Sequence, residues 1–259
     1  MLGKKGGGMK RKYWLTGAND GLGASLAEAL LQTGAQLAIS SPQACQTLSQ
    51  RYPDHVLAVP GNLTDGQTVR EIGEQINRQW GALDTVIINA GTAEHVDGQP
   101  ADDSLIEHII RSNLLAASFC IEAALPLLRL GTAPHLVGIA SPVTYLTPSR
   151  AEGDGKALRQ VFESVRSTPA AKGIDVMLVT PDLADSAMSL DDGLSILTRW
   201  SADAAASYIL AQMNERPDET TLPAASMTAL WPLPSSTRKT RANDDYCQLA
   251  GESPIKGQL

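Results

Sequence analysis

The sequence predicts an α/β fold built on one doubly wound parallel sheet with helices on both faces. Short apolar segments alternate with helical patterns from about residue 13 to residue 225. The short segments are nearly continuous in apolar residues, as expected of strands that are buried on both faces. This alternation predicts parallel pairing, and right-handed crossovers then limit the topology to a doubly wound sheet.

The predicted elements follow one another in regular order. Apolar runs predict strands at 13–17, 36–40, 56–60, 85–89, 135–140 and 175–180. Apolar residues at three- and four-residue spacing predict helices at 22–33, 66–80, 103–129 with one interruption, 156–170 and 202–214. A chain of 259 residues, 43% of them hydrophobic, can bury one large core. We expect a flexible segment at 1–12, a single domain at 13–230 and a polar, mobile tail at 231–259.

Charge and hydropathy exclude two classes of partner. The net charge is -7 and the pI is about 5.1, whereas a nucleic-acid binder needs a basic face. The most apolar run, 114–128, contains Glu122 and Pro126 and is interpreted as a buried helix, so we expect no membrane span. The basic N-terminus lacks the apolar core of a secretory signal. One interpretation is a leader left by an early start site, with Met9 as the natural beginning.

The cysteines and histidines do not indicate a metal site. Cys45, Cys120 and Cys247 are odd in number and lack CxxC spacing, which favours free thiols that pack in a reducing compartment. The histidines are scattered, and no pair has the spacing of metal ligands. We therefore expect a cytoplasmic protein without a bound metal.

A glycine-rich segment, TGANDGLG at 16–23, lies between the first predicted strand and the first predicted helix. In a βαβ unit, the pyrophosphate of a dinucleotide binds there, at the N-terminus of the helix. Gly17 permits the tight turn, Gly21 lets the backbone approach the phosphates, and Gly23 lets the helix pack on the strand. Glycine-rich turns without a ligand also occur, but the strand–turn–helix context indicates a dinucleotide-binding loop.

With this loop and its later landmarks, the chain over roughly 12–225 resembles the short-chain dehydrogenase/reductase family. The later landmarks are Asn89-Ala90-Gly91, Asn113, Ser141, Lys156, Pro181 and Ser186. The resemblance implies a Rossmann-type sheet of seven parallel strands, and hydride transfer between a nicotinamide cofactor and a small alcohol or carbonyl. It also implies catalytic positions at Asn113, Ser141, Glu152 and Lys156. The cofactor-binding positions that it implies are Thr16, Gly17, Asn19, Asp20, Gly21, Leu22, Gly23, Ser41, Asn62, Leu63, Asn89, Ala90, Gly91, Lys156, Pro181 and Ser186.

The cofactor is expected to be NAD or NADP, with NAD slightly favoured. NAD users of such folds place an acid after the second strand, and NADP users place a basic residue nearby. Here Ser40-Ser41-Pro42 provides neither. Asp20 stands where NADP-preferring relatives often have a basic residue, and its charge would repel a 2′-phosphate. Asn62 replaces the family's usual aspartate beside adenine and can still form a hydrogen bond.

Glu152 occupies the place of the family's catalytic tyrosine, four residues before Lys156. Tyr145 cannot replace that tyrosine, because residue 149 is a serine and Pro148 interrupts any helix there. A glutamate has a reference pKa of about 4.3, against about 10 for tyrosine, so it carries no proton to donate at neutral pH. Three interpretations stay open: an exposed ion pair with Lys156, a buried acid of raised pKa that replaces the tyrosine, and a contact with a basic or polar partner.

Two functions therefore compete. The first is an NAD(P)-dependent oxidoreductase with impaired or altered acid–base catalysis, which the intact Asn113, Ser141 and Lys156 favour. The second is a catalytically silent relative that binds a dinucleotide and acts as a sensor or assembly partner. Glu152 and the substitution of the family's usual glycine by Asp182 favour this second function. Relatives assemble through the helices near 103–129 and 156–170, so a homodimer or homotetramer is expected.

Overall fold

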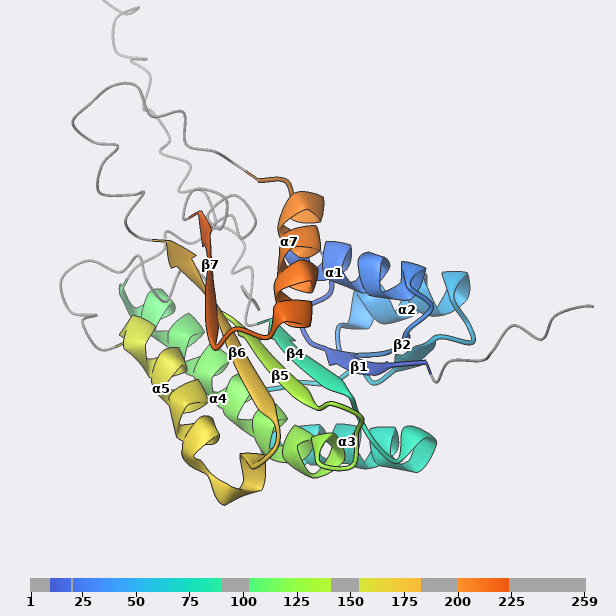
Figure 1. Cartoon of the computed structure of the whole chain (residues 1–259), viewed down its shortest axis with the longest axis horizontal. Coiled ribbons are helices and arrows are strands. Elements are labelled where there is room, and N and C mark those ends of the chain that lie inside the picture. The colour runs from blue at the N-terminus through green and yellow to red at the C-terminus, as the bar shows by residue number, and fades with distance from the viewer. Residues whose placement is uncertain (1–9, 20, 90–102, 141–153, 183–199, 224–259) are drawn as a thin grey trace, which may run out of the picture.

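The computed structural model describes residues 10–19, 21–89, 103–140, 154–182 and 200–223. Seven parallel strands form one sheet in the order β3-β2-β1-β4-β5-β6-β7, which confirms the predicted fold class (Figure 1). The strands are β1 (Lys12–Leu15), β2 (Gln36–Ile39), β3 (Val56–Ala58), β4 (Thr85–Asn89), β5 (His135–Ile139), β6 (Asp175–Asp182) and β7 (Glu219–Pro223). Because the strand order reverses between β1 and β4, the carboxyl ends of these two strands form a topological switch point.

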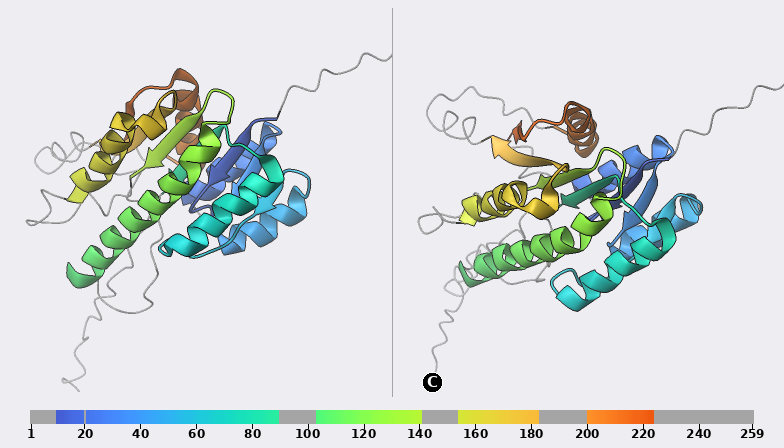
Figure 2. Two further views of the ribbon diagram at one scale, coloured as in Figure 1. Left: turned by 90° about the horizontal axis from the view of Figure 1, so that it is seen from below. Right: turned by 60° about the horizontal axis from the view of Figure 1, so that its bottom comes forward.

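Within the described residues, three helices cover each face of the sheet. They are α1 (Gly21–Gln32), α2 (Pro42–Arg51), α3 (Gly66–Trp80), α4 (Asp103–Leu128), α5 (Asp154–Ser167) and α7 (Ala202–Glu215), with a short 3-10 turn, η2 (Pro169–Ala171), after α5. Figure 2 shows α3, α4 and α5 side by side on one face. The buried residues form two clusters, one between the sheet and these three helices, the other between the sheet and α1, α2 and α7.

Local sequence explains where several helices begin and end. The Asp65 carboxylate accepts the backbone N–H of Thr68 at 3.0 Å and so caps the start of α3, and Gly81, with φ of 73°, is the C-cap residue after its last residue, Trp80. The Ser201 hydroxyl accepts the N–H of Ala204 at 3.1 Å at the start of α7. Such caps satisfy N–H groups that have no partner within the helix.

The structure differs from the predicted elements in three places. It adds α2, which the sequence analysis did not predict, and β7, a strand that was expected only from the family resemblance. The interruption predicted in the long helix is wrong, because α4 continues through Pro126. Pro126 cannot donate a backbone hydrogen bond of its own, and the helix ends two residues later, at Leu128.

The helix α4 bears on the expectation of no membrane span, which stays a prediction. Its part Ile110–Leu128 has a mean hydropathy of 1.2 over 19 residues, which satisfies the length and composition of a transmembrane helix. The core helix of a folded domain satisfies the same criteria. One face of α4 packs into the core through Ala117, Cys120 and Leu128, so its apolar character has a structural explanation in the fold.

Candidate functional site

The loop between β1 and α1 has a geometry that requires glycine. Gly17 and Gly21 have φ of 63° and 49°, in the left-handed region that side chains disfavour. A Cβ on Gly23 would lie 1.8 Å from the carbonyl oxygen of Gly17. The loop can therefore keep this shape only with glycine at these three positions.

Asn89, the last residue of β4, joins that loop to the neighbouring strand. Its Nδ2 donates to the Gly17 carbonyl at 2.8 Å, and its backbone N–H donates to the Thr16 hydroxyl at 3.1 Å. Asn89 is 4% exposed, and its Oδ1 is buried without a hydrogen-bond partner among the described residues. The carboxyl ends of β1 and β4 are thus fixed to each other at the switch point, with one acceptor left for a ligand.

These residues fit a dinucleotide pyrophosphate. The first turn of α1 contains no acidic side chain, and the first N–H groups of any helix lack intrahelical partners. The helix N-terminus carries about half a positive charge. The positive helix end and the glycine loop are suited to the phosphates of a nucleotide. The buried acceptor without a partner among the described residues, Asn89 Oδ1, is suited to a neighbouring hydroxyl.

The segment after β2 is organised around the same loop. The Ser41 hydroxyl accepts the backbone N–H of Ala18 at 2.6 Å, and the Ser40 hydroxyl accepts the indole N–H of Trp14 at 2.9 Å. Asn19 Oδ1 accepts the N–H of Ala44, in the first turn of α2, at 3.3 Å. Ser41 and Asn19, both predicted to bind the cofactor, therefore hold the glycine loop and α2 together. Ser41 followed by proline was the local signal for this helix that the sequence analysis missed.

The two residues predicted beside adenine lie between β3 and α3. Asn62 Oδ1 accepts from the backbone N–H and the hydroxyl of Thr64, at 3.0 and 2.8 Å. Leu63 packs against the core cluster of the α3 and α4 face. The oxygen of Asn62 thus shapes its own turn, while Leu63 anchors that turn on the core.

The predicted catalytic residues divide between described and undescribed parts of the chain. Asn113 is 3% exposed within α4, and Lys156 lies in the first turn of α5. Ser141 and Glu152 lie outside the described residues, as do Asp20, Ala90, Gly91 and Ser186 of the predicted cofactor site. Pro181 lies near the carboxyl end of β6, paired in register with Leu222 of β7. Since helices begin and strands end at the carboxyl edge of a parallel sheet, Lys156 and Pro181 lie towards the edge that carries the glycine loop. The roles assigned to them stay predictions.

The described cysteines do not form a reactive site. Burial raises the pKa of the Cys120 thiol to about 12, and burial also raises the pKa of the Cys45 thiol. Both are free thiols. A protonated, buried thiol is a poor nucleophile, so both residues act in packing. Within the described part of the chain, no group of three or more metal-ligating side chains occurs.

Comparison with known proteins assigns the family. The family model described as short chain dehydrogenase matches residues 12–193. The chain belongs to the short-chain dehydrogenase family. An uncharacterized oxidoreductase of Mycobacterium tuberculosis is 28% identical over 240 residues, which cover 87% of this chain and 94% of that protein. An uncharacterized oxidoreductase of Staphylococcus aureus is 27% identical over 185 residues, covering 68% of this chain and 78% of that protein.

Solved structures show the same fold. A short-chain dehydrogenase from Streptomyces avermitilis superposes with a TM-score of 0.65 at 18% identity, covering 85% of this chain and 91% of that one. The RhlG–NADP complex of Pseudomonas aeruginosa superposes with a TM-score of 0.64 at 20% identity, covering 84% and 96% of the two chains. At these identities the likeness concerns the fold alone.

Proposed function

We propose that this protein is an NAD(P)-dependent oxidoreductase that transfers hydride between the nicotinamide cofactor and a small alcohol or carbonyl, with altered acid–base catalysis. The observation that carries the proposal is the junction of Gly17 and Asn89, which fixes the glycine loop beside the positive end of α1. When bound, the dinucleotide supplies or accepts the hydride. Family membership and the oxidoreductase names of the relatives support this reaction class.

In this proposal each part of the chain has a separate task. The backbone N–H groups of the first turn of α1 bind the pyrophosphate, and the glycine loop, held by Ser41 through the Ala18 N–H, lets it approach. Lys156 binds the cofactor ribose, and Ser141 orients the substrate oxygen by a hydrogen bond. Asn113 is buried in α4, where it supports the catalytic network through polar contacts. No metal is part of the proposal.

The unusual feature is the proton donor. Glu152 stands where the family has tyrosine, and a glutamate at its reference pKa of about 4.3 is ionised at neutral pH. An ionised carboxylate has no proton to give and repels a developing oxyanion. General acid catalysis is typically worth about 10²–10⁴-fold in rate, so we expect tight cofactor binding together with slow turnover.

NAD is proposed ahead of NADP because Asp20 is acidic and Ser40, Ser41 and Pro42 offer no cation to a 2′-phosphate. The first test is therefore fluorescence titration with NADH and with NADPH. Binding of at least one, with the tighter constant for NADH, is expected. If the protein binds neither, the proposed function is wrong.

The second test is Glu152→Tyr, assayed with the preferred cofactor on small and lipophilic ketones and aldehydes. A gain in turnover of about tenfold or more, which is smaller than the rate enhancement that a general acid typically provides, would favour a silenced site. A loss would show that Glu152 itself takes part in the reaction. Glu163→Tyr is the matched control, because Glu163 is an exposed residue of α5, the helix that carries Lys156, and the change should leave turnover unaltered.

A catalytically silent protein that senses or assembles in response to a dinucleotide is the second candidate, and Glu152 is the residue that favours it. Such a protein would bind NADH or NADPH but show no turnover with any substrate of the panel. A homodimer or homotetramer formed through α4 and α5, and a cytoplasmic location, also remain part of the proposal.

A further inference from the structure

The helix α5, which carries Lys156, has a weak beginning in its own sequence. It starts at Asp154 and includes Gly155 in its first turn, and glycine is among the least favourable residues within a helix. Its inner face is held by Leu158 and Phe162, which are 1% and 0% exposed. The first turn thus depends on contacts that α5 makes with the rest of the fold.

One such contact is an ion pair between α5 and the edge strand. Arg159 Nη1 donates to Glu219 Oε2 at 2.7 Å, and Arg159 Nη2 donates to Glu219 Oε1. The Thr180 hydroxyl also donates to Glu219 Oε1, at 2.9 Å. Glu219 is the first residue of β7, and Thr180 lies two residues before the end of β6. One carboxylate therefore joins α5, β6 and β7.

This ion-paired group lies close in sequence to two residues predicted to bind the cofactor, Lys156 and Pro181. Arg159 follows Lys156 by three residues, a shift of about 4.5 Å along a helix axis. Thr180 is 3% exposed and directly precedes Pro181, a predicted cofactor-binding residue. A two-pronged arginine–carboxylate pair fixes orientation as well as distance. The group thus connects the backbone of Lys156 with the carboxyl end of β6.

We propose that Arg159, Glu219 and Thr180, here called the α5 clamp, position the first turn of α5 and with it Lys156 against the cofactor. This inference rests on the proposed function. None of the three touches the reacting atoms in this account, so they are positioning residues. Arg159 and Glu219 have side-chain exposures of 39% and 32%, so these two residues can be substituted without opening the core.

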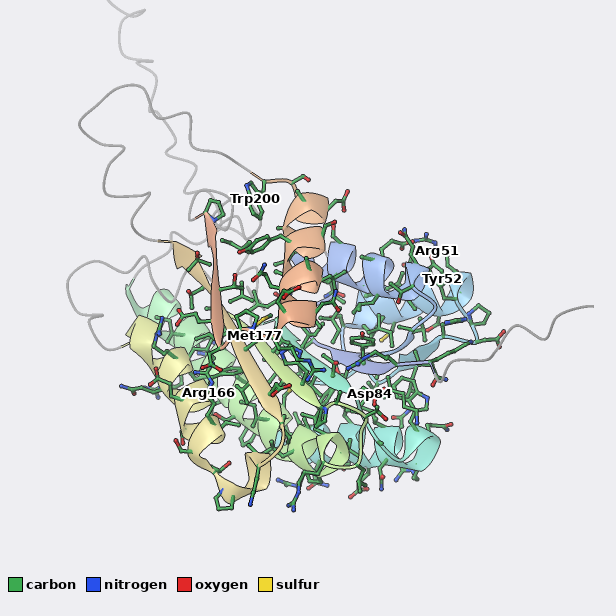
Figure 3. The ribbon with its side chains drawn as sticks, viewed as in Figure 1. Arg51, Tyr52, Asp84, Arg166, Met177 and Trp200 are labelled. Atoms are coloured by element: carbon green, nitrogen blue, oxygen red, sulfur yellow. The ribbon has the colours of Figure 1, made fainter. Side chains whose placement is uncertain are left out.

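A second arginine should confine the effect of losing the clamp to the first turns of α5. Arg166, near the end of α5, donates to the carbonyl oxygen of Val176 at 3.0 Å and also to that of Asp218. Figure 3 labels Arg166 on this helix. Because Arg166 holds the last turns to β6 and to the start of β7, loss of Arg159 should loosen the first turns and leave the helix attached.

The molecule contains a matched control in another place. Arg51 binds Glu28 through two N–H groups, each at 3.0 Å, and the Tyr52 hydroxyl donates to the same carboxylate at 2.5 Å. This group has the same chemistry as the clamp but joins α1 to the end of α2. Figure 3 labels Arg51 and Tyr52 on the side of the molecule remote from α5. Arg51→Met therefore reports the effect of losing such a pair alone.

The experiment compares Arg159→Met, Glu219→Gln, their double variant and Arg51→Met. Hydrogen exchange of the cofactor-free protein is followed by mass spectrometry, and dissociation constants for NADH and NADPH are measured by fluorescence. We expect exchange at residues 154–161 to become at least fivefold faster, and the dissociation constant of the better cofactor to rise five- to tenfold, in all three clamp variants. The double variant should match the singles, Arg159→Lys should recover part of the affinity, and Arg51→Met should change neither quantity.

Unchanged exchange at 154–161 in Arg159→Met would overturn the proposal. Faster exchange with unaltered cofactor affinity would also overturn it, because the clamp would then be only structural. Failure of the unmodified protein to bind either cofactor would refute the proposed function, and the positioning role with it, before any variant is made. A failure confined to the variants concerns the clamp alone.

Discussion

We expect the protein to lose stability in mild acid because of His135, the buried first residue of β5. The side chain is 1% exposed, and its Nε2 has no hydrogen-bond partner among the described residues. Burial lowers its pKa from 6.5 to about 4, helped by the positive charges of Arg216 and Arg11 and opposed by Asp175. Asp84, labelled in Figure 3, directly precedes Thr85, which pairs in register with His135, and its carboxylate accepts the backbone N–H groups of Lys12 and Thr132.

The sign and size follow from proton linkage. As the pH falls below 6.5, the unfolded chain binds a proton at His135, whereas the native protein does so only near pH 4. Stability contributed by neutral His135 is complete above pH 6.5 and decreases as the pH falls through this window. The full difference corresponds to about 3 kcal/mol, of which about 2 kcal/mol is lost between pH 7 and pH 5.

The measurement is urea unfolding at pH 7 and pH 5 for the unmodified protein and for His135→Asn. Carboxylates titrate alike in both proteins, so the difference between their pH dependences isolates His135. We expect the unmodified protein to lose about 2 kcal/mol more than the variant over this range. His55→Asn, in the turn before β3, keeps His135 and should retain the steep loss. Equal slopes for the unmodified protein and His135→Asn would refute the reasoning.

Three further predictions concern glycines and the surface of α4. Gly23→Ala places a Cβ 1.8 Å from the Gly17 carbonyl oxygen, so the loop must shift. If the shift costs one hydrogen bond to a phosphate, worth about 1.5–3 kcal/mol, dinucleotide binding in a fluorescence titration should weaken by about tenfold or more. Gly138→Ala places a Cβ 2.2 Å from the Phe162 ring, and chemical denaturation should show a loss of about 1–3 kcal/mol, with no loss contradicting the packing. Leu115 is 43% exposed on α4. If two copies of the chain pair through this helix, Leu115→Glu should lower the molar mass measured by light scattering. An unchanged molar mass would exclude the surface around Leu115 as the interface.

The sequence predicted the elements whose hydrophobic period is strong and missed those whose formation depends on neighbours. The helix α2 has few apolar residues, and only the Ser41-Pro42 start announced it. The strand β7 alternates buried and exposed residues over five positions and ends in proline, which is a weak local signal. It forms because β6 offers an edge in register, with Val179 opposite Thr220.

The sequence predicted individual residues of the candidate site but not the contacts that join them. Gly17, Gly23 and Asn89 were identified from motif positions, but the bond from Asn89 Nδ2 to the Gly17 carbonyl joins residues 72 positions apart. The clamp between Arg159 and Glu219 spans 60 positions. Neither residue of that pair belongs to a motif, and period and propensity report only on neighbours along the chain, so only the fold reveals such contacts.

The weak start of α5 and the missing tyrosine are separate matters in physical terms. Gly155 lowers the helix propensity of the first turn by about 1 kcal/mol, whereas burial of Leu158 or Phe162 contributes about 1.5–3 kcal/mol each. These two side chains, together with Arg159 and Arg166, hold α5 to the sheet whatever residue occupies position 152. Since these contacts come from residues 158–166, we expect Glu152→Tyr to change the proton chemistry and to leave this scaffold in place. A change in turnover from that variant can therefore be attributed to the acid–base group.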